Sequence, residues 1–284
     1  METLLEKDKK QTSKFLKPDF STKVGRDFLA FYLQTKFKQI LAYDQKTEDP
    51  IIQSVHPKFL NKFLRRLVNN PTKRIMIAIT GESASGKTTI CDKIKDVIAH
   101  HNMQLSIFST DNYFNDISDK IKIYGDFDKL RDSGYDVDSP KSFQLDILKN
   151  DIEKLSNGEN ITTPEYILDG RGISKPNSLP VNSTKIIVAE GIATMYEDVK
   201  DIFDIKIYVD VDKKIQKKWF FDRASQRNQN QENAQKHWDY IQIAAQKYII
   251  PHKEDADIVI NGAANLEYFT RIVEYVYKIT NNFQ

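Results

Sequence analysis

The sequence has little cysteine and no long apolar run. Cys91 is the single cysteine among 284 residues, so no intramolecular disulfide can form and no cysteine pair has the spacing of a zinc or redox site. No stretch reaches the roughly eighteen apolar residues of a membrane span, and the first residues lack the apolar core of a secretion signal. Neither sign of charge dominates, because the formal net charge is +2, and the aromatic residues do not alternate with a basic stripe. We therefore expect a cytoplasmic protein from a reducing compartment, with neither membrane nor nucleic acid as a partner.

The spacing of apolar residues changes along the chain and predicts two parts. From residue 24 to 41 they recur every three or four residues, as in an amphipathic helix, and a second helix is expected from Pro57. After Pro71, short apolar runs alternate with helical stretches, which is typical of a parallel sheet buried on both faces. The sequence thus predicts a lead-in and helical extension over residues 1–70 and a three-layer α/β domain over residues 71–284. The five expected strands are 75–79, 105–108, 185–189, 205–209 and 256–260.

The predicted extension has an apolar side that two helices cannot bury between themselves. Phe28, Tyr32 and Phe37 lie on this side. Packing within the chain is one explanation for them, and a contact between copies in a homo-oligomer is the other.

Residues 81–88 read Gly-Glu-Ser-Ala-Ser-Gly-Lys-Thr, which matches the Walker A pattern of a P-loop. An expected strand enters this stretch and an expected helix leaves it, which argues against a chance match. Backbone N–H groups at a helix N-terminus hold phosphate oxygens, and glycine lets the chain approach them closely. We expect Lys87 to reach the β- and γ-phosphates of ATP and the Thr88 hydroxyl to ligate Mg²⁺. The whole predicted nucleotide-binding stretch is Gly81, Glu82, Ser83, Ala84, Ser85, Gly86, Lys87, Thr88 and Thr89.

Two acidic residues follow other expected strands. Asp111 comes just after the second strand, and Glu190 ends the third. Since ligands bind at the carboxyl edge of such sheets, both carboxylates are expected near the phosphate loop. Alone, each would be read as a cap or turn residue, but this position favours function. Asp111 is predicted to accept the proton of an attacking hydroxyl or to lie by the metal, and Glu190 to assist in holding Mg²⁺.

Motifs between residues 74 and 260 resemble, in consistent order, the uridine kinase, phosphoribulokinase and pantothenate kinase group of P-loop kinases. This resemblance implies the P-loop NTPase fold, ATP and Mg²⁺ as cofactors, and phosphoryl transfer to a hydroxyl of a small molecule. The motifs after the phosphate loop are Thr-Asp-Asn-Tyr-Phe at 110–114, Tyr-Asp-Val-Asp-Ser-Pro at 135–140, Thr-Pro-Glu-Tyr at 163–166, Ala-Glu-Gly at 189–191, Tyr-Val-Asp at 208–210, Tyr-Ile-Ile-Pro-His-Lys at 248–253 and Ala-Asp-Ile-Val-Ile at 256–260.

The resemblance also implies roles for individual residues. Asp111 would be the base that activates a 5′-hydroxyl, Asp138 would contact the ribose, and Tyr166 would contact the nucleoside. Tyr113 is expected to be a further substrate contact. After the fourth strand a closing lid over residues 223–238 is implied.

The implied lid carries two arginines, Arg223 and Arg227. The resemblance directs them to the phosphates, where together with Lys87 they would act in catalysis. A guanidinium suits this role because it can grip phosphate oxygens with two parallel hydrogen bonds. Their spacing alone fits a solvated helix face equally well.

The chain departs from uridine kinases at the position that meets the base, where no histidine occurs and Arg171 lies nearby. A buried arginine there would favour an anionic or carbonyl-rich substrate. The helical extension and Trp-Phe-Phe-Asp-Arg at 219–223 are similar to bacterial pantothenate kinases. A uridine or cytidine kinase is the leading prediction, and a kinase of pantothenate, a sugar phosphate or another small alcohol is the first alternative. A nucleotide-binding regulatory module is the second, which Asp111 argues against because a binder needs no base.

Overall fold

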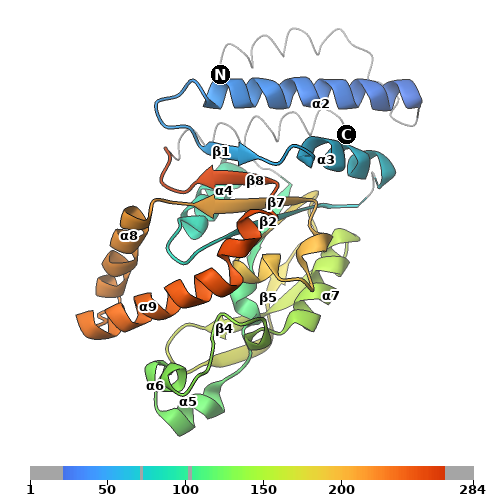
Figure 1. Cartoon of the computed structure of the whole chain (residues 1–284). Coiled ribbons are helices and arrows are strands. Elements are labelled where there is room, and N and C mark those ends of the chain that lie inside the picture. The colour runs from blue at the N-terminus through green and yellow to red at the C-terminus, as the bar shows by residue number, and fades with distance from the viewer. Residues whose placement is uncertain (1–21, 71–72, 102–103, 266–284) are drawn as a thin grey trace.

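The computed structural model describes residues 22–70, 73–101 and 104–265, and a six-stranded sheet lies at its centre (Figure 1). The strands follow the order β1-β8-β7-β2-β6-β3. All neighbours pair in parallel except β1, which is antiparallel to β8. The five expected parallel strands are therefore confirmed, and β1 is an addition. The strands are β1 (Ile52–Val55), β2 (Ile75–Gly81), β3 (Leu105–Ser109), β6 (Ile186–Glu190), β7 (Ile205–Asp210) and β8 (Ile258–Asn261).

Helices cover both faces of the parallel strands, as the three-layer prediction requires. Successive side chains of a strand point to opposite faces, and the residues of β2 accordingly separate into two apolar clusters. Ile79 packs with α4 (Lys87–His101), whereas Met76 and Ala78 pack with α7 (Leu145–Ser156). Cys91 lies buried in the α4 cluster. Strands that are apolar on both faces are thus explained by burial on both sides.

A separate antiparallel hairpin was not predicted from the sequence. It consists of β4 (Ile161–Ile167) and β5 (Ile173–Val181), and its pairing is irregular between Thr163 and Glu165. Both strands contain proline and many polar residues, so neither reads as an apolar run. Figure 1 shows α5 (Ser118–Tyr124) and α6 (Phe127–Asp132) beside this hairpin.

The two expected N-terminal helices are present as α2 (Lys23–Asp44) and α3 (Phe59–Asn69). At the end of α2, buried Asp44 accepts hydrogen bonds from the backbone N–H groups of Ile51 and Ile52, both at 2.9 Å, and so fixes the entry into β1. Because β1 pairs with β8, the first 70 residues contribute a strand to the sheet of the remainder. The division at residue 70 stays a prediction, and the expected lead-in up to residue 21 lies outside the described residues.

Two further long helices are α8 (Lys213–Gln226) and α9 (Gln231–Tyr248), and the expected lid falls on the end of α8 and the first half of α9. Among the described residues, no helix is both long and apolar enough to cross a membrane. Short 3₁₀ helices occur among the described residues at η1 (Thr110–Tyr113), η2 (Pro140–Ser142), η3 (Ile192–Met195), η4 (Lys200–Ile202) and η5 (Ile250–Lys253).

Candidate active site

The phosphate-binding stretch forms the turn between β2 and α4. Gly81 and Gly86 have φ angles of 143° and 98°, which side chains rarely adopt. A Cβ on Gly81 would also lie 2.3 Å from the carbonyl oxygen of Val209, and one on Gly86 would lie 2.9 Å from that of Gly262. Both positions thus require glycine, because the loop lies against the ends of β7 and β8. The amide N–H groups that open α4 make this turn a suitable anion site.

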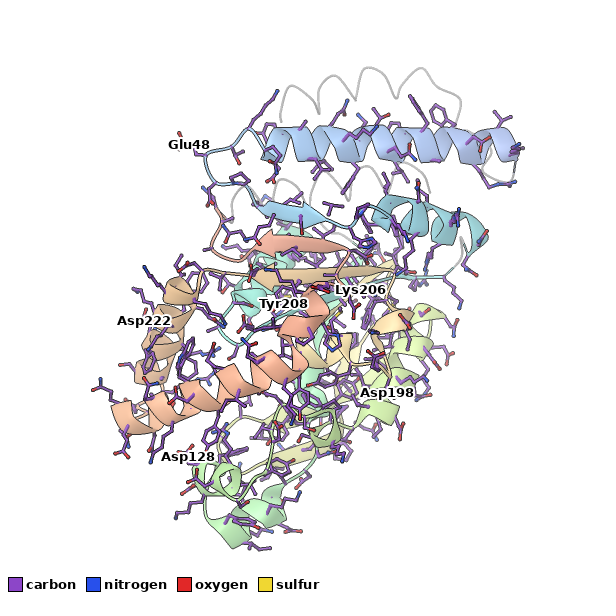
Figure 2. The ribbon with its side chains drawn as sticks, in the orientation of Figure 1. Glu48, Asp128, Asp198, Lys206, Tyr208 and Asp222 are labelled. Atoms are coloured by element: carbon purple, nitrogen blue, oxygen red, sulfur yellow. The ribbon has the colours of Figure 1, made fainter. Side chains whose placement is uncertain are left out.

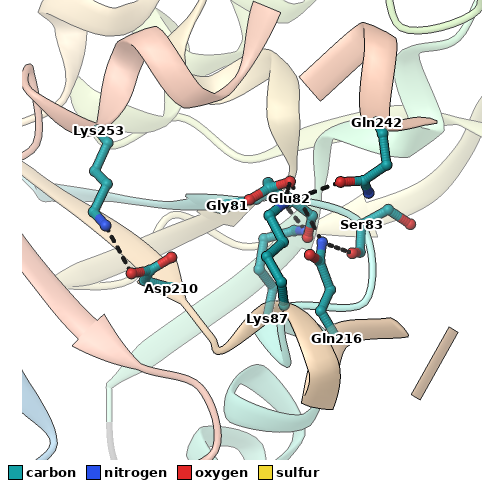
Figure 3. Close-up of polar contacts among 9 residues, drawn as sticks. Gly81, Glu82, Ser83, Lys87, Asp210, Gln216, Gln242 and Lys253 are labelled. Atoms are coloured by element: carbon teal, nitrogen blue, oxygen red, sulfur yellow. Dashed lines mark hydrogen bonds and ion pairs between the residues drawn. The ribbon is translucent and has the colours of Figure 1, made fainter. Parts of the chain in front are cut away.

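The side chains of the loop also fit a phosphate ligand. The Lys87 ammonium donates to the carbonyl oxygens of Gly81 and Glu82 at 2.9 and 2.8 Å (Figure 3). Burial lowers the pKa of Lys87, while the neighbouring Glu190 and Asp111 carboxylates act to raise it. The Ser85 hydroxyl is buried and has no hydrogen-bond partner within the described residues. A confined cation, a free hydroxyl and a helix N-terminus are together complementary to a polyphosphate.

The structure brings the two predicted acids to this loop. Asp111 lies in η1, and its pKa is raised to about 7, first by burial and then by the charge of Glu190, with Lys87 opposing the shift. Gly191, which follows Glu190, lets the end of β6 lie this close to η1. A Cβ on Gly191 would lie 2.1 Å from the Thr110 hydroxyl and 3.1 Å from Asp111 Oδ1. The oxygens of Asp111, Glu190 and the adjacent Thr88 are donors that Mg²⁺ prefers. These residues could hold the ion that the sequence predicted.

Two further predicted residues lie near the segment that carries Asp111. The charge of Asp138 contributes to the raised pKa of Asp111, so the two carboxylates lie near each other. Burial raises the pKa of Asp138 itself to about 6, and Arg131 of α6 acts to lower it. The Tyr166 ring packs on Phe114 with centroids 5.2 Å apart. The hairpin therefore delivers Tyr166 to the segment that carries Asp111.

Two predicted substrate residues are not brought to this region. Tyr113 is fully buried, and its hydroxyl donates to Asp151 of α7 at 2.9 Å. It is a core residue because its polar end finds a partner behind the sheet. Arg171 was expected to be buried, but its side chain is 67% exposed at the tip of the β4–β5 hairpin, where it pairs with Asp169. The structure therefore removes the reason for expecting an anionic substrate at Arg171.

The two predicted arginines occupy different positions. Arg223 on α8 donates to the Ser83 hydroxyl at 3.1 Å, and its pKa is lowered, first by burial and then by the nearby Arg227. Arg227 caps the end of α8 and is exposed. Arg223 thus lies at the phosphate loop in the present arrangement, and Arg227 lies just beyond it.

Sequence reasoning missed residues that hold the loop from outside its motif. Gln216 donates to the Ser83 carbonyl at 2.8 Å (Figure 3), and Gly262 lies so close that a Cβ on it would be 1.9 Å from the Ser85 carbonyl oxygen. Tyr196 was also missed, and it holds a different segment: its hydroxyl donates to the backbone carbonyl of Asp138 at 2.5 Å. The spacing of Gln216 and Arg223 on one helix face was the available signal for Gln216. Neither Gly262 nor Tyr196 belongs to a pattern that would reveal its contact.

Comparisons with known proteins agree with this geometry. The sequence model of the phosphoribulokinase / uridine kinase family matches residues 76–266. Uridine-cytidine kinase B of Dictyostelium discoideum is 26% identical over 221 residues, which cover 75% of this chain and 87% of that protein. Uridine kinase of Halobacterium salinarum is 29% identical over 192 residues, with 66% and 80% covered.

Solved structures extend the agreement to the fold. Phosphoribulokinase from Rhodobacter spheroides superposes with a TM-score of 0.51 at 15% identity, covering 67% of this chain and 70% of that one. At this identity the similarity concerns the fold alone. The match of the family model over most of the sheet and all of the phosphate loop shows that the chain belongs to the phosphoribulokinase / uridine kinase family.

Proposed function

We propose that this chain is an ATP-dependent kinase that phosphorylates the 5′-hydroxyl of a pyrimidine nucleoside, uridine or cytidine. The observation that carries the proposal is the Asp111 carboxylate, which lies close enough to Lys87 and Asp138 for the charges of both to act on its pKa. A protein that only binds nucleotide needs no carboxylate there. The names of the two kinases reported above favour a nucleoside as acceptor.

The mechanism assigns one task to each group. Asp111 accepts the proton of the attacking hydroxyl, and a pKa near 7 leaves it able to do so near neutral pH. Lys87 and Arg223 offset the charge that develops on the transferred phosphoryl group, which is where catalysis of this reaction mostly resides. Mg²⁺, held by Thr88, Glu190 and Asp111, would add a further positive charge to the phosphates.

The acceptor is held on the other side of Asp111. Asp138 offers a carboxylate to the hydroxyls of a ribose, and its backbone is fixed by Tyr196. Tyr166 offers an aromatic ring to a nucleobase, and its own position is set by a tilted contact with the Phe114 ring. These contacts hold the attacking hydroxyl close to the Asp111 carboxylate. They replace a bimolecular encounter by an oriented one.

The proposal is tested by ADP release from the purified protein with Mg-ATP and a panel of acceptors. The panel contains uridine, cytidine, adenosine, pantothenate and ribulose 5-phosphate. Turnover with uridine or cytidine is the expected result. Turnover only with pantothenate or the sugar phosphate would keep the fold and mechanism but contradict the nucleoside assignment, and no turnover with any alcohol would favour a regulatory module.

Replacing Asp138 with asparagine should raise the KM for the nucleoside about 10- to 100-fold, because a charged hydrogen bond to the ribose is worth about 1.5 to 3 kcal/mol. The KM for ATP should change little. Steady-state kinetics with each substrate varied in turn makes the measurement. Asp119→Asn is the matched control, since Asp119 is 89% exposed on α5 and pairs with Lys122. A similar rise in both Michaelis constants would show that Asp138 does not act on the acceptor specifically.

A further inference from the structure

One face of α8 lies against the phosphate loop. Lys213, Gln216 and Arg223 are spaced so that they share this face. Gln216 and Arg223 both bond Ser83, as described above, and the buried Phe220 between them belongs to an apolar cluster against which Ala84 packs. The loop is therefore held from outside by a helix that begins three residues after β7 ends.

The loop carries an acidic side chain in its second position. Glu82 is 7% exposed, and the Lys213 ammonium forms an ion pair with its carboxylate at 2.5 Å. The same ammonium donates to Gln242 of α9 at 3.0 Å. Figure 3 shows Glu82 between Gln216 and Gln242, beside the backbone that holds Lys87. Two helices from the far end of the sequence thus converge on one loop carboxylate.

A carboxylate inside an anion-binding loop opposes the ligand of that loop. Like charges in a partly desolvated site repel strongly, since the effective dielectric constant is well below that of water. The repulsion is removed when a cation is paired with the carboxylate. Within the described residues, Lys213 is the side chain that forms an ion pair with Glu82.

We propose that Lys213 determines the nucleotide affinity of the phosphate loop by neutralising Glu82, and so acts as a positioning residue without touching the phosphates. The proposal rests on the proposed function only in assuming that the loop binds ATP and ADP. The ion pair also joins α8 and α9 to the loop, so the charge of the loop depends on where these helices lie.

The experiment is calorimetric titration of Mg-ADP into the purified protein, which measures binding without turnover. Lys213→Met should weaken binding about tenfold, because it leaves the Glu82 carboxylate in the loop without a counterion. Lys213→Arg should recover most of the affinity, and Glu82→Gln should tighten binding. The double variant E82Q/K213M should return to within about threefold of the parent, because both members of the pair are then uncharged.

Lys218→Met is the matched control, because it removes the same charge from the same helix. Lys218 pairs with Asp222, and Figure 2 shows Asp222 on the outer side of α8, away from the sheet. The affinity of Lys218→Met for Mg-ADP should equal that of the parent. Thermal melting of each variant confirms that it is folded, and the exposed half of the Lys213 side chain makes its replacement tolerable.

Two results would overturn the inference. An unchanged affinity in Lys213→Met would show that the ion pair has no effect on the ligand. A double variant as weak as Lys213→Met alone would show that Lys213 binds the phosphates itself. A parent protein that fails to bind Mg-ADP at all would instead contradict the proposed function, and this is seen in the first titration before any variant is compared.

Discussion

Replacing Asp111 with asparagine is expected to lower kcat for phosphoryl transfer by about 10²- to 10⁴-fold, which is the usual contribution of a positioned general base. The substitution keeps the size of the side chain but removes its capacity to take a proton. Because Lys87 and the backbone of the loop hold the nucleotide, the affinity for Mg-ATP should change much less. Single-turnover transfer and nucleotide titration on the same preparation separate the two effects.

The same substitution should stabilise the folded protein at alkaline pH. The pKa of Asp111 rises from 3.8 to about 7 on folding, so the folded state keeps its proton where the unfolded state has lost it. Stability should therefore fall as pH rises from about 4 to 7 and stay low above 7, with a total loss on the order of 2 to 4 kcal/mol. Asp111→Asn removes this loss, so its melting temperature at pH 8 should exceed that of the parent by several degrees, and the difference should vanish near pH 4.

Asp92→Asn serves as the control for both measurements. Asp92 lies on α4 and pairs with Lys95 on the protein surface, so its loss should alter neither transfer nor the pH dependence of melting. If Asp111→Asn transfers phosphate at the parent rate, Asp111 is not the base. If its melting temperature follows that of the parent at every pH, the buried carboxylate does not destabilise the fold.

Replacing Gly262 with alanine is expected to weaken Mg-ATP binding about 10- to 100-fold, because overpacking in a tight contact costs about 1 to 3 kcal/mol. The added Cβ would lie 1.9 Å from the Ser85 carbonyl oxygen and 2.8 Å from Val209 Cγ1. Neither neighbour can rotate away without moving backbone or core, so the loop must shift. The turn between β2 and α4 then loses the shape that suits it to a phosphate.

Gly134→Ala is the matched control for backbone strain. Gly134 has a φ of 93° with nothing within 4 Å of an added Cβ, so alanine there strains the backbone without a clash. Its melting temperature should fall slightly while its affinity for Mg-ATP stays at the parent value. Equal affinities of Gly262→Ala and the parent, measured by titration, would show that the loop tolerates the displacement.

The parallel strands and the long helices were predictable because their signals are local. Strands buried on both faces read as apolar runs, and β2 leads directly into the glycines and Lys87 of the phosphate loop. The hairpin escaped detection because Pro164 and its polar neighbours break the alternation that marks a strand. β1 escaped because the strand has only four residues, and its pairing partner β8 is about 200 residues away in the chain.

The candidate site was likewise predictable where its residues follow local patterns in the sequence. Lys87, Asp111 and Glu190 follow strands, and the shared edge of a parallel sheet brings such residues together whatever the intervening sequence. Tyr113 and Arg171 were misplaced because adjacency to a motif does not determine which way a side chain points. The direction depends on partners, which are Asp151 in the core for Tyr113 and the neighbouring Asp169 for Arg171.

The sequence by itself determined the anion-binding turn, the acid that follows β3 and the layered sheet, because each depends on residues close together in the chain. Only the tertiary structure decided how the site is charged and held. Asp111 acquires a pKa near 7 because burial and Glu190 act on it together. Glu82 acquires its counterion from Lys213, 131 positions along the chain. Charge and packing act through space and not along the chain, so both depend on residues that only the folded structure brings together.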